Sequence, residues 1–511
     1  MNTASPEQRS RYDLLYPLLF GLAALAIRLW HLDFESIWLD EAMTAYHSSL
    51  PALTHWTTPV VNKPPLYYHL TDLIWSPGDG AFILRLPSAI FGVLSVVLAW
   101  FFGKAISGRR TAFLCAFFVL ISAVNIKYSQ EARHYMMLTL GFEIVALALL
   151  QLVRNASAPR PALSLILWLG AGILLMIHAH PIAIHYVAAA GISYLVALAC
   201  SRRLQLTDIA YPLAACTLAG LTVLPWILVM PTSFEWLDQV SFAVAVSDFG
   251  KLSGAGGIVM LLALAGLVLH ARQKSRSEGT LLLGLLVLPP LMIWLTGLIK
   301  PVFMLRTILP VHFVAAAGLA ILIDRIRGRR LAFMAVALLG GLMLYQTFKY
   351  YSTPRKEDWQ SLARQWQELA QPGDLMIFHR PDNLYPVLFY LDQQMPPAYY
   401  LRQGDDGTQR LIALDNAWPG RGGTTPPPET ASPVAPGNAW LAKRGGNTPP
   451  AIAEPIAYLE KASNATYSVS QAWRYKNTWL VQLRQAPERP ALEELQAQLG
   501  KVGFKQVGLS D

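Results

Sequence analysis

The chain has 511 residues, of which 54% are hydrophobic and only 14% are charged. A soluble domain carries about 25% charged residues, so the composition excludes an ordinary soluble protein and indicates an integral membrane protein with some soluble mass attached. The net charge of +9 does not call for a nucleic-acid partner, because the cations fall in short loops between apolar runs. The three cysteines lie in or beside apolar runs, so they predict no disulfide framework.

Apolar runs follow one another along the first two thirds of the chain. A transmembrane helix needs about 20 predominantly apolar residues. Runs of about this length predict a polytopic α-helical membrane protein with about eleven spans, near residues 14–32, 81–103, 111–127, 134–153, 162–179, 181–200, 209–230, 254–270, 279–299, 303–324 and 331–349.

Basic residues mark alternate loops between these runs. Arg9 and Arg11 precede the first run. Lys or Arg also recurs in the loops at 103–110, 154–160, 201–205, 271–276 and 324–330. Cytoplasmic loops carry such an excess of Lys and Arg. We therefore expect a cytoplasmic N-terminus and, after an odd number of spans, a C-terminus on the outside.

From Tyr350 onward the hydropathy falls, and the chain takes on the pattern of a soluble α/β domain. Periodicity predicts helices at 357–369 and 491–499, and buried strands at 373–379, 439–444 and 478–484. A Pro-, Gly- and Thr-rich stretch at 420–437 is expected to be a mobile loop.

The predicted division is a transmembrane domain at 1–349 and a soluble extracytoplasmic domain at 350–511. The first outside loop, near 33–80, contains the adjacent acids Asp40 and Glu41. Both are flanked by large apolar residues at the predicted membrane edge, where ionised groups are costly and usually functional. For the other acids of this loop, a solvated loop with an aromatic belt is the simpler interpretation.

The second outside loop, at 128–135, brings an acid, a cation and a histidine into one tight turn. These are Glu131, Arg133 and His134. A pair of charges that satisfy each other would explain Glu131 and Arg133 equally well. The turn is therefore a candidate site with a purely structural alternative.

Two further outside loops carry candidate ligands. The pair His178 and His180, with His185 nearby, has the spacing of a metal site, although capping and hydrogen bonding explain such histidines more often. Lys300 and Arg306 lie at a predicted membrane boundary, where they would suit either a lipid headgroup or a bound phosphate.

Acids, cations and histidines thus gather at the ends of several spans on one face. A carboxylate can take a proton from an incoming hydroxyl group, and cations can hold a phosphate that leaves. A transporter more often carries its ionisable groups near the middle of the bilayer, where Glu143 is the exception. The pattern favours group transfer from an anionic lipid phosphate at the outside face.

Five segments carry a resemblance to a known family: WLDEAMTAY (38–46), KPPLYYHL (63–70), YSQEARHYMM (128–137), RTILP (306–310) and KEDWQSLA (356–363). They resemble bacterial members of glycosyltransferase family 39, which includes protein O-mannosyltransferases and is related to lipid A aminoarabinose transferases in the GT-C superfamily. The resemblance covers residues 38–359. It implies a GT-C fold in the bacterial inner (plasma) membrane, with the C-terminal α/β domain in the periplasm.

The resemblance also implies an inverting glycosyltransferase that uses a polyprenyl-phosphate-linked sugar. The family's catalytic base matches Asp40, with Glu41 beside it, and the second acid matches Glu131. Its phosphate-binding cations match Lys63 and Arg306. Further substrate-binding candidates are Tyr67, Tyr128, Arg133 and His134 in these motifs, and His180 of the loop with the histidine pair.

Three departures from the family patterns leave the acceptor open. Asn62 replaces the Glu that aminoarabinose transferases carry before the motif Lys, and Met43 replaces their Arg after the acid pair. Leu138 replaces an acid of the protein mannosyltransferases. No cofactor is therefore expected to be obligatory, because Asn62 does not support a divalent metal site.

The expected function is transfer of a sugar to a hydroxyl group on a lipid, glycan or protein at the periplasmic face. Membrane lipids are the other expected partners, and nucleic acid is not. The alternative is a lipid-linked-sugar transporter or flippase with a periplasmic sensing domain.

The predicted topology can be measured directly. A periplasm-specific reporter fused after Asp511 should be active, because the basic loops place the C-terminus outside. The same reporter fused in the basic loop at 271–276 should be silent. The reverse pattern would put the acids on the cytoplasmic face and reject the scheme.

Overall fold

The computed structural model describes residues 6–57, 63–156, 162–201, 205–229, 238–391, 398–403, 409–413, 438–444, 449–463, 465–487 and 491–502. The chain divides into two compact units. The first, here called the helical unit, comprises Met1–Leu32, Ala52–Thr71 and Arg85–Thr353. The second, called the α/β unit, comprises Asp33–Pro51, Asp72–Leu84 and Pro354–Asp511. Each unit is described by itself.

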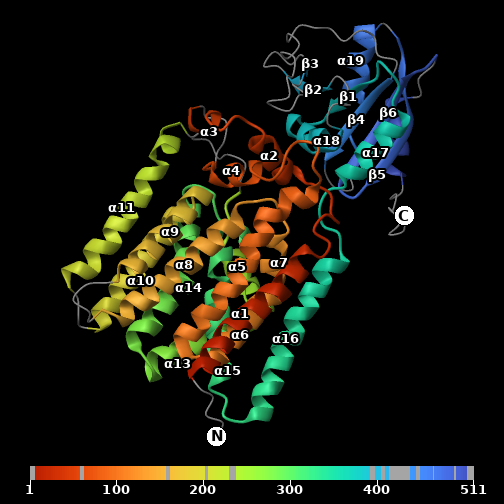
Figure 1. The fold of residues 1–511 in the computed structure, drawn as a ribbon. Coiled ribbons are helices and arrows are strands. Elements are labelled where there is room, and N and C mark those ends of the chain that lie inside the picture. Colours follow the sequence, from red (N-terminus) through yellow and green to blue (C-terminus); the bar gives the residue numbers. More distant parts are fainter. Residues whose placement is uncertain are drawn as a thin grey trace. The chain divides into compact units, whose positions relative to one another are not determined.

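The helical unit is a bundle of long helices with short helices in its loops (Figure 1). The short helices are α3 (Thr54–Thr57), α4 (Leu66–Asp72), α7 (Ala123–Ser129) and α12 (Phe242–Lys251). The others are α1 (Pro6–Leu29), α5 (Ala81–Ser107), α6 (Arg109–Leu120), α8 (Tyr135–Arg154), α9 (Leu163–Ala179), α10 (Ala183–Ser201), α11 (Leu206–Val229), α13 (Gly257–Gln273), α14 (Arg276–Gly297), α15 (His312–Asp324) and α16 (Arg329–Ser352).

Each apolar run predicted from the sequence coincides with apolar helix. Among the described residues, six helices are long and apolar enough to cross a bilayer: α5, α8, α10, α11, α14 and α16. The helices α6 and α7 form a further candidate span that is bent by 59°. The remaining runs coincide with shorter apolar helices, at Leu14–Leu29, α9, α13 and Leu309–Asp324. By length and composition six or seven spans are therefore supported, and the count of eleven stays a prediction.

Two glycines allow α8 and α9 to lie against each other. A Cβ atom added to Gly141 would lie 2.8 Å from the carbonyl oxygen of Gly172, and one added to Gly172 would lie 2.7 Å from that of Gly141. Small residues allow helix backbones to approach closely inside a membrane. Any larger residue at either position would force the two helices apart.

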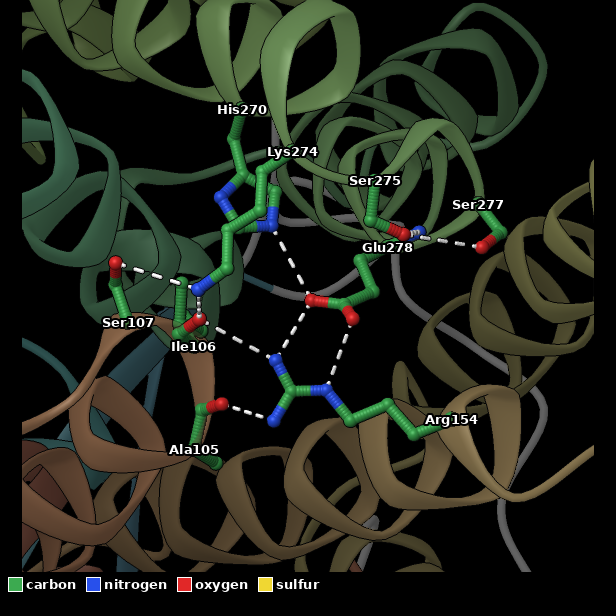
Figure 2. A network of polar contacts seen from close by, with 9 residues as sticks. All are labelled: Ala105, Ile106, Ser107, Arg154, His270, Lys274, Ser275, Ser277 and Glu278. Carbon is green, nitrogen blue, oxygen red and sulfur yellow. Dashed lines mark hydrogen bonds and ion pairs between the residues drawn. The ribbon is translucent and has the colours of Figure 1, made fainter.

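A polar network joins the ends of α5, α8, α13 and α14 (Figure 2). Arg154 donates from Nε to Oε1 of Glu278 at 2.9 Å, and from Nη2 to Oε2 at 2.7 Å. His270 Nε2 lies 3.2 Å from the same Oε2. Arg154 and Lys274 also donate to the last carbonyl groups of α5. The cations thereby satisfy acceptors that the helix itself leaves without partners.

The α/β unit contains a six-stranded sheet with the order β3-β2-β1-β4-β6-β5. Its strands are β1 (Leu375–Phe378), β2 (Ala398–Gln403), β3 (Gln409–Ala413), β4 (Asn438–Arg444), β5 (Tyr467–Tyr475) and β6 (Thr478–Gln485). The central strand β1 is parallel to β2 and β4, and the other neighbouring pairs are antiparallel. The strands predicted at 373–379, 439–444 and 478–484 are confirmed as β1, β4 and β6.

Helices cover both faces of the sheet because successive side chains of β1 point to opposite sides. Met376 and Phe378 pack with α17 (Trp359–Leu369) and α18 (Leu384–Leu391). Leu375 and Ile377 pack with α19 (Ala453–Ser463) and α20 (Leu492–Gly500). The predicted helices at 357–369 and 491–499 are confirmed as α17 and α20. The loop predicted at 420–437 lies outside the described residues.

The network in Figure 2 predicts a measurable loss of stability when its acid is removed. In Glu278→Ala, Arg154 loses both oxygens of a half-buried bidentate pair, which we expect to cost about 1–3 kcal/mol of unfolding free energy. Thermal unfolding of the purified protein would measure the change. The control is Asp248→Ala, which removes a pair with the exposed Lys251 and should cost about 0–1 kcal/mol. Equal losses in the two variants would contradict this expectation.

Candidate functional site

The turn between α7 and α8 holds three of the predicted site residues. Glu131, Arg133 and His134 are all at least nine-tenths buried. The backbone N–H of Arg133 donates to the carbonyl group of Glu131 at 2.7 Å, which closes a tight turn. Ser122 caps the start of α7 at the break after α6, and α7 ends at Ser129, shortly before the turn. An acid and a basic residue are thereby held in the turn directly before α8.

Lys127, one helical turn before Glu131, is a cation that contacts this acid. Its Nζ lies 3.8 Å from Oε1 of Glu131 and 4.8 Å from the ring centroid of Tyr128. The sequence analysis did not select Lys127, although the spacing of four residues on a helix was the available signal.

Two neutral histidines lie near three cations. The rings of His134 and His180 are 4.9 Å apart. Burial lowers the pKa of both histidines well below the ordinary value, and the neighbouring Arg133, Lys63 and Arg306 lower the pKa further. Both imidazoles are therefore neutral at pH 7, and the positive charge of the cluster resides on the three cations.

Hydrogen bonding distinguishes the two imidazoles. Nδ1 of His180 accepts from the backbone N–H of Ile182 at 3.0 Å, so its proton is carried on Nε2. Both ring nitrogens of His134 are buried without a hydrogen-bond partner among the described residues. A buried imidazole of this kind has one donor and one acceptor to offer to a ligand.

Aromatic rings and hydroxyl groups hold the arginines. The guanidinium of Arg306 lies 5.5 Å from the ring centroid of Tyr135, and that of Arg133 lies 6.0 Å from the same ring. The Oγ of Ser88 donates to the carbonyl group of Arg133 at 2.9 Å, so the hydroxyl of Tyr67, 2.6 Å away, donates to Ser88. Tyr67 thus positions the backbone of Arg133. Sequence reasoning missed Tyr135 and Ser88.

Asp40 and Glu41 lie in the first turn of α2 (Leu39–Ser48), in the α/β unit. The positive end of a helix dipole favours acids at this position. Glu41 is fully buried, and its Oε2 lies 2.9 Å from Nζ of Lys356. Asp40 is half-buried. The two adjacent acids therefore occupy different environments, because Glu41 is in a buried ion pair and Asp40 keeps some accessible surface.

The segment that carries these acids is tied to α18. The hydroxyl of Tyr390 accepts from the backbone N–H of Ile37 at 2.7 Å. The ring of Tyr46 meets that of Tyr385 edge-on, with centroids 4.8 Å apart. These contacts place α2 in the α/β unit although it lies more than 300 residues earlier in the chain than α18.

The predicted site residues form two sets. The helical unit brings together Lys63, Tyr67, Tyr128, Glu131, Arg133, His134, His180 and Arg306, and the α/β unit holds Asp40 and Glu41. Asn62 lies outside the described residues. Within the part of the chain that the structure describes, no three His, Cys, Asp or Glu side chains gather as metal ligands would.

Known proteins resemble this chain in sequence and in fold. Residues 62–228 match the family model described as dolichyl-phosphate-mannose-protein mannosyltransferase. The crystal structure of ArnT from Cupriavidus metallidurans bound to undecaprenyl phosphate is 16% identical, with a TM-score of 0.57, and the match covers 91% of this chain and 98% of that chain. The apo structure of the same protein is 15% identical, with a TM-score of 0.59, and the match covers 91% of this chain and 97% of that chain. A comparison with curated protein sequences found no match.

These findings confirm the resemblance that the five sequence motifs indicate. The matched segment includes Lys63 and the turn that carries Glu131 and Arg133. The likeness to ArnT extends over nearly the whole chain and shows a shared fold.

The ion pair between Glu41 and Lys356 predicts a large stability effect. Lys356→Met removes the cation that lies 2.9 Å from a fully buried carboxylate, which we expect to cost about 3–5 kcal/mol of unfolding free energy. Adding Glu41→Gln should restore part of that loss, because the buried side chain is then neutral. Thermal unfolding of the full chain would test both variants. Arg380→Met, which removes an exposed pair with Asp382, should change stability by about 0–1 kcal/mol.

Proposed function

We propose that the protein is an inverting glycosyltransferase of the GT-C type. It moves a sugar from a polyprenyl-phosphate donor to a hydroxyl group on a lipid, glycan or protein acceptor at the periplasmic face of a bacterial inner membrane. The observation that carries the proposal is the cluster of Lys63, Arg133 and Arg306 around two neutral histidines. The family match over residues 62–228 and the undecaprenyl phosphate bound by ArnT support the same donor chemistry.

The three cations would bind the donor phosphate and stabilise it as it leaves. When the glycosidic bond breaks, its electron pair moves to the phosphate oxygen, and the phosphate gains negative charge. Cations fixed in a partly desolvated site stabilise this charge more than water would. His134 adds a neutral donor within the same cluster, and Tyr67 keeps Arg133 in place through Ser88.

Asp40 is the proposed general base. An alcohol is a weak nucleophile, so it must lose its proton as its oxygen attacks the anomeric carbon. The attack comes from the face opposite to the phosphate, which inverts the configuration in a single displacement. Glu41 is the weaker candidate because its carboxylate is already paired with Lys356, and we assign it to the positioning of α2. Glu131 is the second candidate for the base.

This step needs neither a nucleotide nor an obligatory metal ion. One proton goes to the carboxylate, one sugar goes to the acceptor, and the products are the glycosylated acceptor and polyprenyl phosphate. The test is incubation of the purified protein with radiolabelled polyprenyl-phosphate sugars and a membrane extract. Label in a new lipid, glycan or protein supports the proposal and identifies the acceptor.

A second candidate, a transporter of lipid-linked sugars, has one observation in its favour. Two ionisable residues, Arg28 and Glu143, are fully buried inside the helical unit. Hydrogen bonds connect them, from Arg28 to Asn125 at 2.5 Å, from Asn125 to Ser95 at 3.3 Å and from Ser95 to Glu143 at 2.6 Å. A transporter would move the labelled donor across vesicle membranes and leave the acceptor unlabelled.

Replacing the proposed base should abolish transfer while leaving the fold intact. Asp40→Asn keeps the size of the side chain and removes its basicity, so turnover should fall by about 10²–10⁴-fold with donor binding retained. Asp33→Asn, an exposed acid of the same segment, is the matched control and should keep wild-type turnover. If Asp40→Asn retained more than about a tenth of the turnover, the base would have to be sought at Glu131.

Removing a phosphate-binding cation should weaken use of the donor. In Lys63→Ala and Arg306→Ala we expect kcat/KM for the donor to fall on the order of 10²–10³-fold, because the leaving phosphate loses a charged partner. Lys300→Ala, an exposed cation of the loop that precedes Arg306, should have little effect. Steady-state kinetics with varied donor would measure all three. Unchanged donor kinetics in both cluster variants would refute the assignment.

A further inference from the structure

A cavity of about 780 Å³ lies between α5, α8 and α9 of the helical unit. It is distinct from the cation cluster, because none of Lys63, Arg133 and Arg306 lines it. Most of the side chains that line the cavity are aliphatic or aromatic, among them Leu94, Leu140, Leu165 and Trp168. Its volume is within the usual range for sites that bind small molecules, about 300–1,000 Å³.

The cavity extends along about half the thickness of a membrane. On α5 its lining runs from Leu94 to Ala105, and on α8 from Leu140 to Gln151. At 1.5 Å per residue each of these stretches is about 16.5 Å long. The hydrocarbon core of a bilayer is about 30 Å thick. A cavity of this length fits the acyl chain of a lipid from one leaflet.

The polar end of the cavity identifies that leaflet. Lys104 and Gln151 lie near the C-terminal ends of α5 and α8, next to the basic loops at 103–110 and 154–160. Ala105 lines the cavity and also accepts a hydrogen bond from Arg154 in the network of Figure 2. The network therefore fixes the last turn of α5, which carries Lys104.

Charge at this end favours an anionic headgroup. Among the described residues that line the cavity, Lys104 is the charged one, and Gln151 adds an amide. Lys274 donates to the carbonyl group of Ile106 at 2.5 Å and brings a second cation to the same end of α5. Basic pockets between transmembrane helices on the cytoplasmic side attract anionic lipid headgroups.

We propose that this cavity is a binding site for an anionic phospholipid of the leaflet that faces the basic loops. One acyl chain fills the space between α5, α8 and α9, and the phosphate of the headgroup contacts Lys104. The polyprenyl donor is a different ligand, because its proposed phosphate site lies at the opposite end of α8. The proposal is independent of the proposed glycosyl transfer.

Trp168 gives a direct readout, because it lines the cavity and is 59% exposed. Brominated acyl chains quench tryptophan on contact, and the fluorescence difference between the wild type and Trp168→Phe isolates its signal. The full chain would be placed in nanodiscs with increasing fractions of brominated phosphatidylglycerol or brominated phosphatidylcholine. We expect half-maximal quenching at an about fivefold lower fraction of the anionic lipid, as one lysine near an anionic headgroup predicts.

Variants test whether Lys104 contacts the headgroup and whether the acyl chain lies in the cavity. Lys104→Gln should make the two lipids equivalent, whereas Arg330→Gln, an exposed cation beside another basic loop, should keep the preference. Ala148→Phe, which fills the cavity, should reduce quenching by both lipids, and thermal unfolding would show whether that variant is folded. Equal quenching by both lipids in the wild type, or a preference that survives in Lys104→Gln, would overturn the proposal. Undiminished quenching in folded Ala148→Phe would do the same.

Discussion

The burial of cations beside two imidazoles is the constraint on which the helical unit's site depends. Lys63 and Arg133 are at least nine-tenths buried, and Arg306 is half-buried. Like charges in such a setting destabilise a fold unless other groups offset them. The ring of Tyr135 contacts both arginines, and the two histidines stay neutral instead of adding charge. Glu131 contributes a buried acid to the same turn, and the proposed donor phosphate would add further negative charge.

Local backbone structure sets the positions of these cations. The break between α6 and α7 redirects the chain before the turn that holds Arg133. Arg306 lies in a short 3-10 helix, Leu305–Thr307, in which Thr307 accepts from the backbone N–H of Met304 at 3.0 Å. Short, capped elements of this kind hold charged side chains more rigidly than open loops do. The helical unit thus combines long apolar helices with short, capped elements that carry or precede the cations.

Much of the fold could be predicted from the sequence, because burial in lipid or in a sheet imposes continuous apolar runs. The helices of the membrane part and the strands β1, β4 and β6 all carry such runs. Strand β5 was missed because many of its residues are polar and it lies at the edge of the sheet. Lys356 is 315 positions from Glu41, so no local pattern could pair them. The sequence also did not predict that Asp33–Pro51 belongs to the α/β unit, because the rest of that unit's sheet and helices lie more than 300 residues later in the chain.

The pairing of Glu41 with Lys356 also orders events during synthesis. A ribosome adds about 5–20 residues per second, so Glu41 precedes its partner by about 15–60 s. During that interval α2 has been made but α18 and the sheet have not, so Glu41 cannot yet pair with Lys356. The α/β unit is therefore completed only after the membrane part of the chain has been made. The α/β unit can therefore assemble only once synthesis has reached the last third of the chain.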